Sequence, residues 1–216
     1  MGELAINGVE IEHLGHASFR ISYGDYCLYI DPYIKPGDNK KVELILTTHE
    51  HFDHCAEENI RDLLEDVGTV VAPGGCVEQL NGLDVKAVEA GDEFDIDKIA
   101  VKVVAAYNVN KFREPGKPFH PAGLGVGYVI TINKVAIYHA GDTDFIPEMK
   151  TLGNIDVALL PIGGFFTMDY KEAALAANAI KPKIVVPMHY DSSGKIKADP
   201  EDFKKLVDKS VRVEII

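Results

Sequence analysis

Cysteine is scarce in this sequence of 216 residues. The three copies, Cys27, Cys55 and Cys76, are an odd number and too few for a disulfide framework, so we expect free thiols in a reducing compartment. Long apolar runs are missing as well, and the first ten residues lack a basic leader. We therefore expect neither a transmembrane helix nor a secretory signal. Together these absences predict a soluble, cytoplasmic protein.

Basic residues are also in short supply relative to acidic ones. The chain has 22 Lys and Arg against 34 Asp and Glu, which gives a formal net charge of −12. Such a surface repels nucleic acid and anionic membranes, so we expect neither nucleic-acid binding nor membrane insertion. A small anionic substrate stays possible, because bound cations can invert the local field. The sequence does not determine an oligomeric state.

The remaining composition is that of a globular protein, with 46% hydrophobic and 26% charged residues. No linker or low-complexity tract interrupts it, so we expect a single domain over residues 1–216. Apolar runs predict strands at 17–22, 26–30, 42–47, 69–72, 99–107, 127–132, 135–138, 157–161 and 184–187. Helical spacing predicts helices over 54–67 and 169–180, the second with a capping box at Asp169. This order favours an α/β fold in which two packed sheets are flanked by helices.

The strongest functional signal follows the strand predicted at 42–47. Four of the six residues from His49 to His54 carry metal-binding side chains, namely His49, His51, Asp53 and His54. His49 and His51 are two apart on an extended segment, so their rings point the same way. Asp53 and His54 follow where the chain turns into the predicted helix. One short segment can therefore contribute to two adjacent metal ions, and a polar surface turn is the alternative.

Further ligands must come from elsewhere, and the ends of other strands are the natural places. Asp142 follows the strand predicted at 135–138 and a permissive Gly141. A carboxylate there can bridge two cations, or else cap a turn. His189 follows the strand at 184–187 and is either a metal ligand or a packed core histidine.

These segments, in this chain order, resemble the metallo-β-lactamase superfamily of binuclear metallohydrolases. The openings Leu14–Phe19 and Tyr29–Pro32 are similar to those of its small stand-alone members, the L-ascorbate-6-phosphate lactonase and N-acyl-phosphatidylethanolamine phospholipase D groups. The resemblance implies a four-layer αβ/βα sandwich with the metals at the rim of the two sheets. It also implies that His49 and His51 bind a first metal, that Asp53, His54 and His189 bind a second, and that Asp142 bridges both.

The family has one more histidine on the first metal, soon after the strand predicted here at 99–107. In this sequence that strand is followed by Asn108, and the nearest histidine is His120 within the loop 108–125. We favour His120 as the ligand, with Asn108 or a water as the alternative.

Other polar residues leave two interpretations open. His16 either lies near the metals or is a packed histidine, and Asp31 either orients a ligand histidine or forms an Asp-Pro turn. We expect His139 to be packed and His13 to lie at the surface. Residues 163–166 form either a pocket wall or an exposed turn.

The resemblance implies a metal-dependent hydrolase in which a metal-bridging hydroxide attacks a small ester, lactone or phosphodiester. Asp53 would act as the catalytic residue that orients the nucleophile or moves its proton. The ligand types suit one or two Zn²⁺ or Mn²⁺ ions, and Fe is compatible with them.

Three alternatives remain. A di-iron oxidoreductase on the same fold is disfavoured, because that branch has a carboxylate where this chain has His51. A nuclease is disfavoured by the net charge of −12. A non-catalytic metal-dependent binding protein is supported only by the missing histidine after Tyr107.

Overall fold

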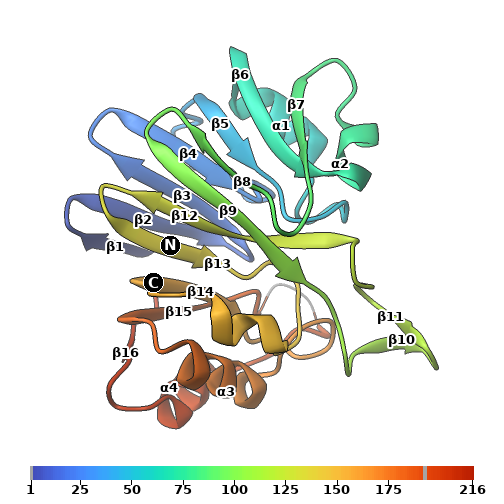
Figure 1. The fold of residues 1–216 in the computed structure, drawn as a ribbon, viewed down its shortest axis with the longest axis vertical. Helices are drawn as coiled ribbons and strands as arrows, with labels where there is room; N and C mark the ends of the chain where they lie inside the picture. The colour runs from blue at the N-terminus through green and yellow to red at the C-terminus, as the bar shows by residue number, and fades with distance from the viewer. Residues whose placement is uncertain (1, 192–193) are drawn as a thin grey trace.

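Two seven-stranded sheets dominate the computed structural model, which describes residues 2–191 and 194–216 (Figure 1). The first sheet contains, in spatial order, β1 (Gly2–Ile6), β2 (Val9–Gly15), β3 (Ser18–Tyr23), β4 (Tyr26–Ile30), β5 (Val42–Leu46), β6 (Leu64–Pro73) and β7 (Asp84–Val88). The strands from β1 to β4 pair antiparallel, whereas β4, β5, β6 and β7 pair parallel. The first half of the chain thus forms one sheet.

The second sheet repeats this plan with the second half of the chain. Its order is β16 (Arg212–Val213), β15 (Ile184–Met188), β14 (Val157–Pro161), β13 (Val135–His139), β12 (Gly125–Ile132), β9 (Ile99–Ala106) and β8 (Glu93–Ile96). Here β8, β9, β12 and β13 pair antiparallel, whereas β13, β14, β15 and β16 pair parallel. A small hairpin of β10 (Phe112–Glu114) and β11 (Lys117–Pro118) lies between β9 and β12 in sequence.

Helices cover the outer faces of both sheets. In the first half, α1 (Glu57–Leu63) and α2 (Gly74–Gln79) share an apolar cluster with β5 and β6 that includes Ile45, Ile60 and Cys76. In the second half, α3 (Tyr170–Ile180), α4 (Pro200–Leu206) and the 3₁₀ helix η1 (Pro147–Thr151) pack beside β14 and β15. The main core joins residues of both sheets, such as Phe19 and Tyr128. The arrangement confirms the predicted four-layer α/β sandwich of the metallo-β-lactamase type.

The helices were also considered as candidates for a membrane span. Within residues 2–191 and 194–216, none of them combines the length and the apolar character that spanning a bilayer requires.

The helix predicted over 54–67 is wrong in its extent. The chain makes a turn in which the His54 and Cys55 amides donate to the His51 carbonyl, and the helix begins only at Glu57. It ends at Leu63 because Leu64 pairs with Val42 of β5 as the start of β6. Val67, which completed the apparent apolar stripe, is 83% exposed. Pairing with the sheet therefore overrides the local helical pattern.

The capping box predicted at the start of α3 is half right. The Asp169 carboxylate accepts from the backbone amides of Lys171 and Glu172, as an N-cap residue does. The Glu172 carboxylate does not turn back to the cap. It accepts instead from the Asn110 and Lys111 side chains and from the Phe145 amide. Glu172 thereby ties the start of α3 to the loop that follows β9.

Candidate metal centre

The site is assembled where parallel strands end. Asp31 follows β4, and Thr48 and His49 follow the neighbouring strand β5. The buried Asp31 carboxylate accepts from the Thr48 amide and hydroxyl, both at 2.7 Å, and from His54 Nδ1 at 2.7 Å. Asp31 therefore fixes both ends of the histidine-rich turn. Of the two interpretations of Asp31, the structure supports the one in which it orients a histidine.

The first cluster contains His49, His51 and His120, each with one ring nitrogen within 4.8 Å of the others. His51 Nδ1 lies 3.0 Å from His49 Nε2 and 3.2 Å from His120 Nε2. His49 is only 1% exposed, whereas His51 is half-buried beside the solvent. Ligands about 2.0–2.1 Å from a tetrahedral zinc lie roughly 3.3–3.4 Å apart, so this spacing suits a shared cation.

Asn108 holds His120 in place and is not itself in the cluster. Asn108 Oδ1 accepts from the His120 backbone amide at 2.8 Å and lies 2.9 Å from His120 Nδ1. Its amide nitrogen donates to the Phe166 carbonyl and to Asp144. Because Oδ1 can only accept, His120 Nδ1 carries the proton and Nε2 presents its lone pair to the cluster. Of the two sequence candidates, His120 has the geometry of a ligand and Asn108 that of its support.

The second cluster contains His16, Asp53, His54 and His189. His16 Nε2 lies 3.1 Å from the Asp53 carboxylate, and its ring centroid lies 4.0 Å from that of His189. The His16 carbonyl accepts from the His189 amide, so a turn of the first sheet is bonded directly to the end of β15. His16 and His189 have φ angles of +55° and +54°, a left-handed conformation that aims both rings into the site.

Asp142 lies between the two clusters. Its Oδ1 is 3.4 Å from His54 Nε2, and its Oδ2 is 3.2 Å from His189 Nε2 and 3.4 Å from His120 Nε2. One carboxylate thus faces histidines of both clusters, which is the position a bridging ligand needs. The preceding Gly141 has φ +64°, and a Cβ there would lie 2.7 Å from the Val126 carbonyl. Only glycine therefore allows the chain to bring Asp142 this deep.

Electrostatics favours a positive charge at the centre. Burial lowers the pKa of His54, but the charges of Asp142 and Asp31 and the hydrogen bond to Asp31 raise it well above the ordinary value. Burial lowers the pKa of His120 to about 4, so this ring is neutral near pH 7. Burial opposes ionisation of Asp53, yet the His16 hydrogen bond and the His54 charge lower its pKa to about 2. Ionised carboxylates beside a protonated His54 mark a place where a divalent transition metal would displace that proton and be bound by the carboxylates and imidazoles together.

Buried polar atoms support this fit. Among the described residues, His16 Nδ1, His54 Nε2, Asp142 Oδ1 and both ring nitrogens of His189 are buried without a hydrogen-bond partner. A buried polar group without a partner costs about 1–3 kcal/mol, so such a concentration at one point requires compensation. Coordination of a metal would engage His54, His189 and Asp142 at once. The residues present therefore fit a metal centre.

All seven residues predicted as metal ligands converge at this place, although their role as ligands stays a prediction. They are His49, His51, Asp53, His54, His120, Asp142 and His189. His16, which the sequence left open, joins them. His139 is packed as expected, with Nε2 bonded to the Ala17 carbonyl. The prediction that His13 lies at the surface is wrong, because it is buried and its ring stacks on Phe19.

A pocket of about 490 Å³ opens over the clusters. Besides cluster residues, it is lined by Tyr33, Phe52, Arg113, Phe119, Phe166 and Ile196. Phe166 confirms the pocket-wall interpretation of the segment 163–166. The other five lining residues were not singled out from the sequence, because each reaches the pocket through the fold. The volume is that of a small-molecule site.

The fold and the histidine-rich site together are those of a metal-dependent hydrolase, and comparisons with known proteins agree. A family model described as the beta-lactamase superfamily domain matches residues 10–189, so the chain belongs to that superfamily.

Similar proteins narrow this to the UPF0173 metal-dependent hydrolases. One from Thermococcus onnurineus is 39% identical over 223 residues, and one from Pyrococcus furiosus is 38% identical over 232 residues. Each alignment covers 96% of both chains. Among solved structures, Igni18, a metallo hydrolase from Ignicoccus hospitalis, is 29% identical with a TM-score of 0.80, covering 96% of this chain and 94% of that one. The narrower resemblance to the lactonase and phospholipase D groups stays a prediction.

Proposed function

We propose that this hydrolase is binuclear and cleaves a small ester, lactone or phosphodiester. The observation that carries the proposal is the pair of donor clusters with Asp142 between them, opening into the 490 Å³ pocket. His49, His51 and His120 would hold one ion, and Asp53, His54 and His189 the other. The imidazole-rich first cluster favours Zn²⁺, while the carboxylates of the second also suit Mn²⁺.

A metal pair in this site supplies Lewis acidity and lowers the pKa of bound water toward neutrality. The chain's own residues do the rest. Asp53 is partly exposed to the pocket, and its Oδ2 faces His16 Nε2. Its low pKa keeps it ionised, so it would accept a hydrogen bond from the nucleophile and orient it. His16 is placed to steady that carboxylate.

Substitution of His51 tests the proposal. His51→Ala removes the nitrogen that faces both His49 and His120, so metal content and hydrolysis of ester, lactone and phosphodiester panels should fall together. Asp38→Ala, which removes an exposed carboxylate outside both clusters, is the control and should keep both. Undiminished turnover by His51→Ala would refute the proposal. If the metal-loaded protein hydrolyses none of these substrates, a non-catalytic metal-dependent binding protein is favoured. If the purified protein contains iron and consumes oxygen, the di-iron oxidoreductase is favoured.

A cytoplasmic location is part of the same proposal. All three cysteines are free and buried, as expected for a chain that does not depend on an oxidising compartment.

A further inference from the structure

The outer wall of the pocket is aromatic. Phe119, Phe165 and Phe166 form a mutual cluster with ring centroids 4.7–5.5 Å apart. Phe52, which also lines the pocket, is 74% exposed and contacts Tyr33 edge-on, with ring centroids 5.8 Å apart. A ligand that covers this phenylalanine would gain the free energy of burying its apolar surface. The wall therefore suits the apolar body of a ligand.

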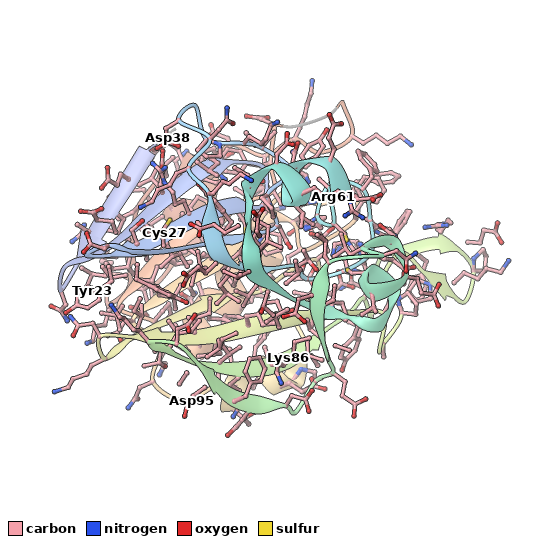
Figure 2. The ribbon with its side chains drawn as sticks, turned by 90° about the horizontal axis from the view of Figure 1, so that it is seen from above. Tyr23, Cys27, Asp38, Arg61, Lys86 and Asp95 are labelled. Carbon is pink, nitrogen blue, oxygen red and sulfur yellow. The ribbon has the colours of Figure 1, made fainter. Side chains whose placement is uncertain are left out.

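Apart from the histidines of the donor clusters, a single basic side chain lines this pocket within the part of the chain that the structure describes. It is Arg113, at the centre of β10. Phe112 pairs with Pro118 and Glu114 with Lys117, so Arg113 is the extra residue of a β-bulge. Bulges commonly turn a side chain toward a site. The hairpin extends at the end of the molecule opposite Tyr23 (Figure 2), and its bulge directs this one side chain back to the pocket.

Charge pairing separates Arg113 from its neighbours on the same loop. Lys111 pairs with Glu172 at 2.9 Å, and Lys117 pairs with Glu114 at 2.8 Å. Across residues 2–191 and 194–216, Arg113 has no carboxylate within ion-pair distance. Its guanidinium lies 5.8 Å from the centre of the Phe119 ring instead. In a chain of net charge −12, an exposed arginine that lines a pocket and has no ion-pair partner is available for an anion.

Lys195 adds a second positive charge on the same aromatic cluster. Its ammonium lies 4.9 Å from the centre of the Phe165 ring, next to the lining residue Ile196. The carboxylates that line the pocket, Asp53 and Asp142, belong to the donor clusters. The pocket is thus polarised, with positive charge beside the aromatic wall and acidic ligands at the floor.

We propose that the substrate is a small ester or lactone with an apolar body and a second, non-reacting anionic group, a carboxylate or a phosphate. The anion pairs with the Arg113 guanidinium, the apolar body packs on Phe119 and Phe166, and the scissile bond reaches the donor clusters. Lys195 reinforces the field at the anionic end. Arg113 is thereby a specificity-determining residue, and this assignment rests on the proposed hydrolytic function.

Equilibrium binding of matched probes tests the proposal without requiring turnover. The metal-loaded protein is titrated calorimetrically with 4-phenylbutyrate and with its neutral counterpart 4-phenylbutyramide. We expect the anion to bind at least about tenfold more tightly, which is the scale of one charge-assisted hydrogen bond. Arg113→Gln should abolish that preference. Lys117→Gln, which removes a cation from the same hairpin, should retain it.

Two outcomes would overturn the proposal: equal binding of both probes by the unmodified protein, or an anion preference that survives in Arg113→Gln. The second result would assign the anion to the metals. Parallel kinetics use 4-nitrophenyl butyrate and the monoanionic 4-nitrophenyl glutarate. Arg113→Gln should raise KM about tenfold for the anionic ester alone, with kcat unchanged. Failure to hydrolyse either ester, with the binding difference intact, would count against the proposed esterase activity and leave the anion site standing.

Discussion

At the scale of single residues, Asn108 illustrates how a departure from a family pattern can be compensated. After β9 the chain has the side-chain amide of Asn108 at the position where the family has a histidine. His120, at the far end of the loop, supplies the imidazole instead. Asn108 binds both the amide and the ring of His120, so the loop closes on itself around this pair. The sequence could suggest His120 but not this support, since the two residues are twelve apart and the β10–β11 hairpin between them was not predicted.

Replacing Asn108 tests whether it positions His120. Asn108→Leu keeps the volume but removes the acceptor for His120 Nδ1, so the ring loses its fixed tautomer and direction. Loss of such support typically lowers metal affinity about 10–100-fold. Competition with a chromophoric chelator measures this affinity. The control is Asn110→Ala. The Asn110 side chain donates to Glu172 and not to a cluster residue, so this variant should bind metal with unchanged affinity. Equal affinities in both variants would contradict the positioning role.

Asp31 is expected to matter for stability as well as for the site. It is fully buried and accepts three hydrogen bonds from Thr48 and His54. Asp31→Ala leaves those donors unpaired and should lower the free energy of unfolding by about 3–5 kcal/mol, measured with urea. The exposed pair of Asp38 with Arg20 gives the comparison, because Asp38→Ala should cost less than about 1 kcal/mol. Similar losses of unfolding free energy in Asp31→Ala and Asp38→Ala would contradict the special role of Asp31 in stability.

At the scale of elements, buried strands were predictable, and so were the limits of α3, but not those of α1. The buried strands β14 and β15 are continuous apolar runs, and β5 is one except for the exposed Glu43, so composition reveals them directly. The first helix was over-extended because Leu64 to Val67 fit a helical stripe, whereas pairing with β5 decides their conformation. The hairpin β10–β11 was hidden inside a Pro- and Gly-rich loop, so Arg113 could not be placed from sequence.

The junction after β14 depends on a glycine. A Cβ on Gly163 would lie 2.2 Å from the His189 carbonyl and equally close to Ile196. Gly163→Ala must push the ends of β14 and β15 apart, which should cost roughly 1–3 kcal/mol and displace His189. Thermal unfolding measures the loss. Gly37→Ala meets nothing within 4 Å and should leave the midpoint unchanged or slightly raised. An unchanged midpoint for Gly163→Ala would show that the junction relaxes freely.

At the scale of the whole molecule, the site joins two half-chains into one structure. His49, His51, Asp53 and His54 come from the first sheet's connections, whereas His120, Asp142 and His189 come from the second. The donor set was predictable because metal ligands are chemically few and recur at strand ends. The pocket wall was not, because any apolar or cationic residue can line a pocket and only the packing selects which ones do.

Metal removal should therefore affect the stability of the entire chain. A cation held by both halves favours the folded state by RT ln(1 + [L]/Kd), about 2.7 kcal/mol at a hundredfold excess over Kd. For a chain of this size that corresponds to roughly 5–11 °C in the unfolding midpoint. Calorimetry before and after chelation measures the shift, and His51→Ala should show a smaller one. Identical midpoints with and without metal would mean that the clusters bind no ion in solution.

The most direct test of the metal centre is anomalous diffraction from crystals of the metal-loaded protein, together with elemental analysis. We expect two peaks roughly 3.5–4 Å apart, one among His49, His51 and His120 and the other among Asp53, His54 and His189, with Asp142 in contact with both. A map without a peak at these side chains, from protein saturated with zinc or manganese, would contradict the binuclear site and the chemistry inferred from it.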